Sequence, residues 1–241
     1  MDRFLRTELL LGGEALEKLS RASVVVAGLG AVGGYAVEAL ARAGVGKLRL
    51  ADMDVLKKSN INRQLYALES TLGCSKADEA ARRVHDINPD CEVTPLKEFV
   101  HRDTMDSILE DPVDFVIDAL DSLNPKIELL TACYSQRIPV VSSMGAALRT
   151  DVTKIRSGDI FDTYSCPLAK IVRKRLRNRK VGRGILCVFS TEHTDFQYGE
   201  PVRDSYKRGR DRRVLGSLPT IPGIYGLMLA HFVIQRLTGN H

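Results

Sequence analysis

The chain has 241 residues, of which 44% are hydrophobic and 27% charged, and its formal net charge is +5. This length can bury an ample core, and the composition is that of an ordinary globular protein rather than of a fibrous or disordered one. No run approaches the ~20 apolar residues of a membrane span, and five cysteines without a Cys-x-x-Cys pair argue against a disulfide framework and a four-thiolate zinc site. The first eight residues carry acids and lack the apolar core of a signal peptide, which predicts a cytoplasmic protein with no membrane partner.

Strands and helices are predicted to alternate through the first 145 residues. The apolar, β-branched run at 23–28 predicts a strand buried on both faces, and the helix predicted at 31–43 stops at the C-cap signal of Gly44. The other predicted elements are strands at 48–51, 92–96, 113–119 and 138–143, and helices at 75–87 (capped by Ser75), 102–109 and 124–136. This alternation predicts an α/β fold, a Rossmann-like, mostly parallel twisted sheet with helices on both faces.

The pattern changes after Gly145. The elements predicted there are strands at 153–156 and 185–190, a very basic helix at 167–180 and an apolar closing helix at 219–237, whereas the polar, Gly- and Arg-rich residues 191–217 predict a mobile loop. No repeat or low-complexity linker separates the two halves. We therefore expect regions 1–145 and 146–241 to form one continuous domain, in which the second region completes the sheet.

The positive charge is concentrated in two segments of the second region. Residues 170–183 carry eight Lys or Arg and no acid, and residues 203–213 carry six Lys or Arg and two acids, so the rest of the chain is net acidic. Such segregation indicates a polyanionic partner. In the basic helix, Leu168, Ile171, Val172 and Leu176 form a predicted apolar stripe. The predicted exposed, nucleic-acid-facing side consists of Lys170, Arg173, Lys174 and Arg177; a solvated charged helix is the alternative.

A glycine-rich turn joins the first strand to the first helix. Gly28 and Gly30 allow a tight turn and close approach of a phosphate to backbone N–H groups, and Gly33 allows close helix–strand packing; Ala31 lies within the same turn. Asp52 ends the second strand, where a carboxylate can accept both ribose hydroxyls. These features alone are equally typical of a dinucleotide-dependent dehydrogenase.

Three residues further along the chain favour ATP over a dinucleotide as the ligand. Asn60 and Arg63 follow in the loop after Asp52, and Lys76 begins the next helix, so amide, guanidinium and ammonium groups can neutralise a triphosphate. Each of these residues alone is equally compatible with a solvated basic loop. Asp121 follows the fourth strand at the same sheet edge, where it can hold Mg²⁺ or instead act as a helix N-cap.

The first 145 residues resemble the ThiF/MoeB/HesA superfamily of adenylating enzymes, the ubiquitin-activating-enzyme-like proteins. The matching sequence segments are Arg3-Phe4-Leu5-Arg6, GLGAVGG at 28–34, AGVG at 43–46, Asp52-x-Asp54, SNINRQ at 59–64, Lys76 and Asp118-Ala-Leu-Asp121. The resemblance implies that Asp52 holds ribose, that Asn60, Arg63 and Lys76 hold the phosphates, and that Asp121 holds Mg²⁺. It further implies a homodimer in which Arg6 reaches the neighbouring subunit's site, so that Arg6, Arg63, Lys76 and Asp121 form the catalytic set.

The second half is similar to the family of tRNA threonylcarbamoyladenosine dehydratases. The similar segments are SSMGA at 142–146, DVTKI at 151–155, Asp159-Ile160, the helix from Cys166 to Arg177, VFSTE at 188–192 and GSLP at 216–219. The resemblance implies an ATP- and Mg²⁺-dependent ligase or cyclase that dehydrates threonylcarbamoyladenosine in tRNA through an acyl adenylate, with 146–241 binding tRNA and a sulfur-relay protein as a further partner.

Two other functions stay open from the sequence. The first is an enzyme that adenylates a ubiquitin-like sulfur-carrier protein, in which Cys166, beside basic residues at a helix start, would form a thioester. The second is a nucleotide-regulated RNA-binding module without turnover. Cys187, within an apolar run, is predicted to be a core residue.

Overall fold

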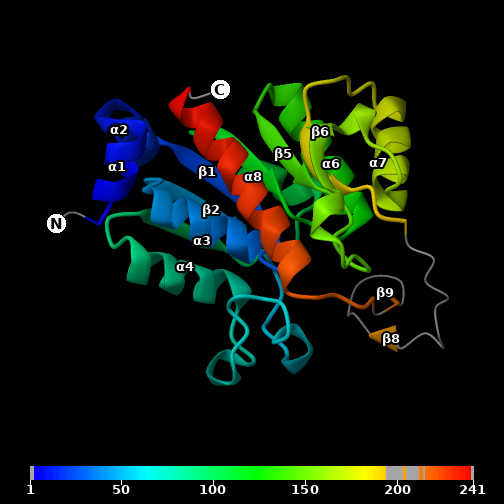
Figure 1. The fold of residues 1–241 in the computed structure, drawn as a ribbon, viewed down its shortest axis with the longest axis horizontal. Coiled ribbons are helices and arrows are strands. Elements are labelled where there is room, and N and C mark those ends of the chain that lie inside the picture. Colours follow the sequence, from blue (N-terminus) through cyan, green and yellow to red (C-terminus); the bar gives the residue numbers. More distant parts are fainter. Residues whose placement is uncertain (1–2, 194–202, 205–211, 214, 240–241) are drawn as a thin grey trace.

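The structure, a computed structural model, describes residues 3–193, 203–204, 212–213 and 215–239. A seven-stranded sheet runs through its centre in the order β3-β2-β1-β4-β5-β7-β6, and every neighbouring pair is parallel except β6 and β7 (Figure 1). The strands are β1 (Ser23–Ala27), β2 (Lys47–Ala51), β3 (Glu92–Leu96), β4 (Phe115–Asp118), β5 (Val140–Ser143), β6 (Ile155–Asp159) and β7 (Leu186–Ser190). The predicted Rossmann-like sheet is therefore confirmed.

Helices cover both faces of this sheet. The α-helices are α1 (Leu5–Leu11), α2 (Gly13–Arg21), α3 (Gly33–Ala43), α4 (Lys76–Ile87), α5 (Met105–Ile108), α6 (Leu123–Gln136), α7 (Pro167–Asn178) and α8 (Thr220–Thr238). One buried cluster joins α2, α3, α4 and α8 to the sheet, and a second joins α5, α6 and α7 to its other face. In β1 the side chains alternate between the two clusters, with Val24 and Val26 in one and Val25 in the other, because successive residues of a strand point to opposite faces.

Local signals explain where these helices begin and end. The Oγ of Ser75 accepts a hydrogen bond from the N–H of Asp78 (3.3 Å), so Ser75 caps α4 as predicted. Gly44 ends α3 in the left-handed conformation, at φ 92°. Gly226 lets α8 lie against α3, since a Cβ there would approach the carbonyl oxygen of Val32 to 2.2 Å. The closing helix therefore packs directly behind the helix that follows the glycine-rich turn (Figure 1).

Two parts of the fold differ from the sequence predictions. The N-terminal helices α1 and α2 were not predicted; α1 has no buried residue, whereas α2 buries Ala15 and Leu19. Most of the predicted loop at 191–217 lies outside the described residues, and its described parts include the antiparallel pair β8 (Arg203–Asp204) and β9 (Arg212–Arg213). In the described part of the chain, no helix has the length and apolarity needed to span a bilayer.

Candidate nucleotide-binding site

The glycine-rich turn lies at the carboxyl edge of the sheet, between β1 and α3. Gly28 has φ +89°, and a Cβ there would lie 2.8 Å from the carbonyl oxygen of Ala119; a Cβ at Gly33 would lie 1.8 Å from the carbonyl oxygen of Gly28. Both glycines are therefore required by the fold. A Cβ at Gly30 would meet nothing closer than the Gln64 amide nitrogen at 3.7 Å, so the fold leaves space at this position. That space is where the turn can admit a ligand.

Asp52, at the end of β2, is bound to this turn. Its Oδ2 accepts a hydrogen bond from the N–H of Leu29 (2.8 Å), and its Oδ1 accepts one from the N–H of Asp54 (2.9 Å). Burial raises the pKa of Asp52, and the charge of Lys76 together with these two N–H donors opposes the rise. The predicted ribose-binding carboxylate is thus held in one orientation beside the glycine-rich turn.

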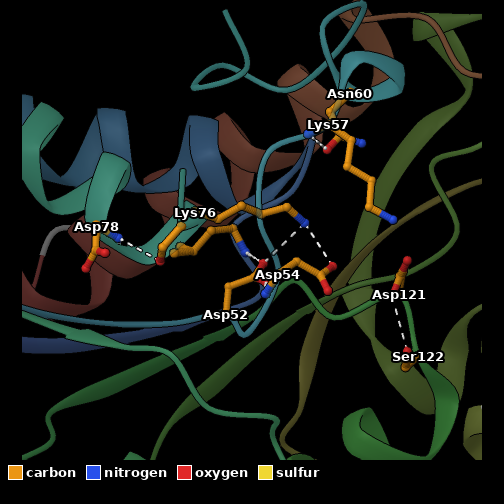
Figure 2. Close-up of polar contacts among 10 residues, drawn as sticks. Asp52, Asp54, Lys57, Asn60, Lys76, Asp78, Asp121 and Ser122 are labelled. Carbon is orange, nitrogen blue, oxygen red and sulfur yellow. Dashed lines mark hydrogen bonds and ion pairs between the residues drawn. The ribbon is translucent and has the colours of Figure 1, made fainter. Parts of the chain in front are cut away.

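Lys76 is buried at the start of α4 and faces two carboxylates. Its Nζ lies 3.1 Å from Oδ2 of Asp54 and 3.8 Å from Oδ2 of Asp52 (Figure 2). The structure therefore places Lys76 beside Asp52. Its ammonium group lies in the same cluster as Asp52, and the contacts of Asp52 with ribose and of Lys76 with phosphate stay predictions.

The loop that carries Asn60 and Arg63 is organised by its own polar groups. The Oδ1 of Asn60 accepts a hydrogen bond from the N–H of Lys57 (3.0 Å). One guanidinium nitrogen of Arg63 donates to the carbonyl oxygen of Ser59 (2.9 Å) and to Oδ1 of Asn62 (2.8 Å). These contacts lie within residues 57–63 and fix the conformation of the loop itself.

Asp121 lies just beyond β4 and is exposed. Its Oδ1 accepts a hydrogen bond from Oγ of Ser122 (3.3 Å), and the side chain of Lys57 points toward it (Figure 2). Ser122, not Asp121, is the N-cap residue of α6, so the N-cap interpretation of Asp121 is wrong. Its carboxylate consequently lies at the sheet edge without a role in starting α6.

A buried ion pair behind Asp121 was not found from the sequence. Lys126 and Asp118 both have side chains with 0% exposure, and Nζ of Lys126 lies 2.6 Å from Oδ2 of Asp118. The same oxygen accepts from Oγ of Ser142 (2.6 Å), while Lys126 also donates to the carbonyl oxygen of Ser143 (2.9 Å). The N–H of Leu120 donates to the other oxygen of Asp118 at 3.1 Å. This network fixes the turn that presents Asp121.

The carboxylate chemistry here fits a magnesium ion that is bound mainly by phosphate. Among the described residues there is no group of three or more His, Cys, Asp or Glu arranged to hold a metal ion. Mg²⁺ commonly uses one or two protein carboxylates and completes its octahedron with water and substrate phosphates. The exposed carboxylate of Asp121 at the edge of the sheet suits that mode of binding.

Of the four basic residues predicted to bind tRNA on α7, the two lysines are exposed, whereas the two arginines contact other residues of the protein. Lys170 and Lys174 are exposed. Arg173 instead donates to the carbonyl oxygen of Thr163 (2.6 Å), and the guanidinium of Arg177 lies 5.3 Å from the centre of the Phe161 ring. Ile171 is 46% exposed and does not belong to the buried stripe, because the buried positions Ala169, Val172 and Leu176 follow a helical spacing that leaves Ile171 to one side.

Two further candidates lie apart from this cluster. Arg6 is exposed on α1, and the helices α1 and α2 pack at the opposite, amino end of the strands, where the N–H of Gly46 bonds the carbonyl oxygen of Leu19 (3.0 Å). Within one chain, Arg6 does not reach the site. Cys166 is 4% exposed and Cys187 is fully buried, the latter as predicted.

The fold and the site together are those of a nucleotide-binding α/β protein, in which Asp52 is bonded to the glycine-rich turn and lies beside Lys76. The profile described as the ThiF family matches residues 2–241. The chain belongs to the ThiF family.

Relatives in this family match over different shares of the chain. The tRNA threonylcarbamoyladenosine dehydratase of Bacillus subtilis is 40% identical over 98% of this chain and 95% of its own length. The crystal structure of the Escherichia coli tRNA N6-threonylcarbamoyladenosine dehydratase in complex with ATP is 34% identical, covers 98% of this chain and 94% of that chain, and superposes with a TM-score of 0.87. The molybdopterin-synthase adenylyltransferase of Salmonella typhimurium is 35% identical, over 63% of this chain and 60% of its own length.

Proposed function

We propose that this protein is an ATP-dependent enzyme that cyclises threonylcarbamoyladenosine in tRNA, with the loss of one water. The observation that carries the proposal is the extent of the similarity: a dehydratase matches 98% of the chain, whereas the adenylyltransferase named above matches 63%. The ATP complex of the Escherichia coli dehydratase, at 34% identity over nearly the whole chain, supports ATP as the co-substrate. A tRNA-modifying role also supports a cytoplasmic location.

The chemistry requires activation of a carboxylate. One oxygen of the threonyl carboxylate attacks the α-phosphorus of ATP, a new bond forms between this oxygen and phosphorus, and the bond to pyrophosphate breaks. The carbamoyl group of the same side chain then attacks the acyl carbon and loses a proton. AMP leaves with the electron pair and with the former carboxylate oxygen, so a ring has formed and the water has been removed at the expense of ATP.

The residues of the site have distinct tasks in this scheme. Asp52 accepts the ribose hydroxyls, and Gly28, Gly30, Ala31 and Gly33 bring backbone N–H groups to the phosphates.

Asn60, Arg63 and Lys76 stabilise the charge that develops on the phosphate oxygens and on the departing pyrophosphate. Asp121 holds Mg²⁺, which when bound neutralises phosphate charge. A preformed arrangement suits this task. Lys76 is held by Asp54, and Asn60 and Arg63 are held by contacts within their own loop.

Two additional elements belong to the proposal. Lys170 and Lys174 on α7, supported by Arg173 and Arg177, bind tRNA phosphates without reading sequence. Arg6 completes the site of a second copy in a homodimer, which is in keeping with its position far from the site of its own chain. The domain boundary near residue 145 then separates an ATP-binding region from a tRNA-binding region within one body, and a sulfur-relay protein stays a proposed partner.

The proposal is tested by pyrophosphate exchange. The protein is incubated with ATP, labelled pyrophosphate and either tRNA bearing threonylcarbamoyladenosine or the same tRNA without the modification. Exchange that needs the modified tRNA supports the proposal, and exchange driven instead by a protein ending in Gly-Gly would support sulfur-carrier activation. Because Cys166 is buried, its thiol is poorly placed to form a thioester with a protein substrate, so Cys166→Ala is expected to keep the activity.

A substitution at Asp121 tests the assignment of this residue to Mg²⁺. Asp121→Asn should abolish exchange but leave tRNA binding intact, because Asp121 is exposed just beyond β4 and is not part of the basic helix α7. Asp162→Asn is the matched control, since Asp162 is an exposed carboxylate that pairs with Arg183 (2.7 Å) in the second region. Full exchange in the Asp121 variant would refute the assignment.

A further inference from the structure

Arg149 is a buried cation with unused hydrogen-bond donors. Its side chain is 4% exposed, and Nε and Nη1 are buried without a hydrogen-bond partner in the part of the chain that the structure describes. A guanidinium stays charged at all physiological pH values, and leaving such a group buried without acceptors is costly. An acceptor from a bound ligand would offset this cost.

The backbone around Arg149 is fixed by long-range contacts. Leu148 has φ +61°, which is unusual for a residue with a large side chain, and its N–H donates to the carbonyl oxygen of Gly216 (2.9 Å). On the other side, the N–H of Thr150 and the N–H of Asp151 each donate to the carboxylate of Glu192 at 3.0 Å. Arg149 is therefore held between two anchored neighbours.

Glu192, which is bonded to the two residues after Arg149, does not accept a hydrogen bond from Nε or Nη1 of Arg149. Glu192 accepts the two N–H groups just named and also the hydroxyl of Thr150 (3.0 Å). Burial opposes ionisation of Glu192, but the N–H groups of Asp151 and Thr150 and the charge of Arg149 lower its pKa. Glu192 thus lies within the field of Arg149 while its oxygens are bound by other donors.

The position of Arg149 along the sheet edge suggests what it binds. Asp52, the proposed ribose ligand, follows β2, and Asp121 follows β4. The loop with Arg149 follows β5, which is the next strand in the sheet order. An acyl group that attacks the α-phosphate has to lie beside the phosphates on the side away from the ribose. In the strand order, the loop after β5 comes beyond Asp121 on the side away from Asp52. A guanidinium is well suited to a carboxylate because both are planar and the hydrogen bonds are charge-assisted.

We infer that Arg149 binds the carboxylate of the threonylcarbamoyl group and directs one of its oxygens toward the α-phosphate. The inference rests on the proposed function, since it assigns the acyl-binding group of the same site. After adenylation, the remaining acyl oxygen stays within reach of the guanidinium. During ring closure negative charge develops on this oxygen, and a fixed cation stabilises it.

The test compares the affinities of two tRNAs in the presence of a non-hydrolysable ATP analogue. Wild-type protein should bind tRNA with threonylcarbamoyladenosine about 10- to 100-fold more tightly than the unmodified tRNA, the range expected for hydrogen bonds to a charged group. Arg149→Met should lose this preference but keep the affinity for unmodified tRNA and for ATP. Arg236→Met, at an exposed arginine near the end of α8, is the matched control and should keep the preference.

Thermal unfolding separates a binding role from a structural one. Because Nε and Nη1 of Arg149 have no hydrogen-bond partner among the described residues, Arg149→Met should melt at or above the wild-type temperature. A clear fall in melting temperature with the preference retained would assign a structural role and overturn the inference. A selective loss of ATP affinity would assign Arg149 to the nucleotide and would also overturn it.

A substrate-side experiment needs no variant. Wild-type protein is given the modified tRNA with its threonyl carboxylate converted to the methyl ester, which should bind no more tightly than unmodified tRNA; tight binding of the ester would overturn the inference. The two proposals fail differently. If wild-type protein neither prefers nor converts the modified tRNA, the proposed function fails, whereas conversion together with a preference retained in Arg149→Met refutes the role of Arg149 alone.

Discussion

Replacing Lys126 by Met is expected to destabilise the whole protein, although Lys126 is not expected to touch the nucleotide. Asp118 would keep its hydrogen bonds from Ser142 and Leu120 but would lose a cation 2.6 Å away, in a place where its side chain has 0% exposure. Breaking a buried pair from one side costs about 3–5 kcal/mol. For a chain of this size, that loss lowers the melting temperature by about 6–20 °C.

The assay is urea unfolding, followed by circular dichroism, with two controls. The double variant Asp118→Asn with Lys126→Met removes both charges and should lose less stability than Lys126→Met alone, because no buried charge is left without a partner. Lys18→Met breaks an exposed pair with Glu14 and should change stability by less than about 1 kcal/mol. A loss below about 1 kcal/mol for Lys126→Met, or an equal loss for single and double variants, would refute the reasoning.

Three further predictions concern ligands. Gly30→Ala should fold normally, since a Cβ there meets no close protein atom, but should bind ATP weakly. Gly28→Ala should fail to fold stably, because a Cβ there would collide with the backbone after β4. Normal ATP affinity of Gly30→Ala, measured by calorimetry, would contradict this prediction. AMP affinity should be full at pH values above the raised pKa of Asp52 and should fall as the pH drops through it, because only the ionised carboxylate accepts both ribose hydroxyls. Asp52→Asn should remove this pH dependence in the same titration. Lys170→Glu and Lys174→Glu should each weaken tRNA binding and flatten its dependence on salt in filter-binding assays, with ATP affinity unchanged, and an unaltered salt dependence would argue against a phosphate contact at α7.

Local patterns in the sequence were sufficient for most of the fold. The apolar runs at β1 and β4 are buried on both faces, so their composition alone marks them as central strands. Ser75 and Gly44 are local signals, and both function as caps. The helix α2 was missed because it buries only Ala15 and Leu19, and the pairing of Glu14 with Lys18 (2.7 Å) is the signal that would have revealed it.

The site was predictable where its residues belong to short motifs, and not where partners come from distant segments. Asp52 and Lys76, both named from the sequence as parts of one site, lie 3.8 Å apart in the structure. The pairing of Asp118 with Lys126 depends on the packing of α6 against β4, and nothing in the local pattern distinguishes Lys126 from a solvated lysine.

Partners in space also explain two departures on the basic helix. Arg173 is engaged by Thr163, and Arg177 lies over Phe161, because the turn before α7 returns to the same surface. Composition could identify a basic helix but not which of its arginines are engaged within the protein.

The most direct test of the central claim is nucleoside mass spectrometry of tRNA after incubation with the protein, ATP and Mg²⁺. The account predicts that threonylcarbamoyladenosine is replaced by a product lighter by one water, that one AMP is released for each product, and that Asp121→Asn gives neither. Unchanged threonylcarbamoyladenosine, in the presence of wild-type protein that binds both ATP and the tRNA, would contradict it.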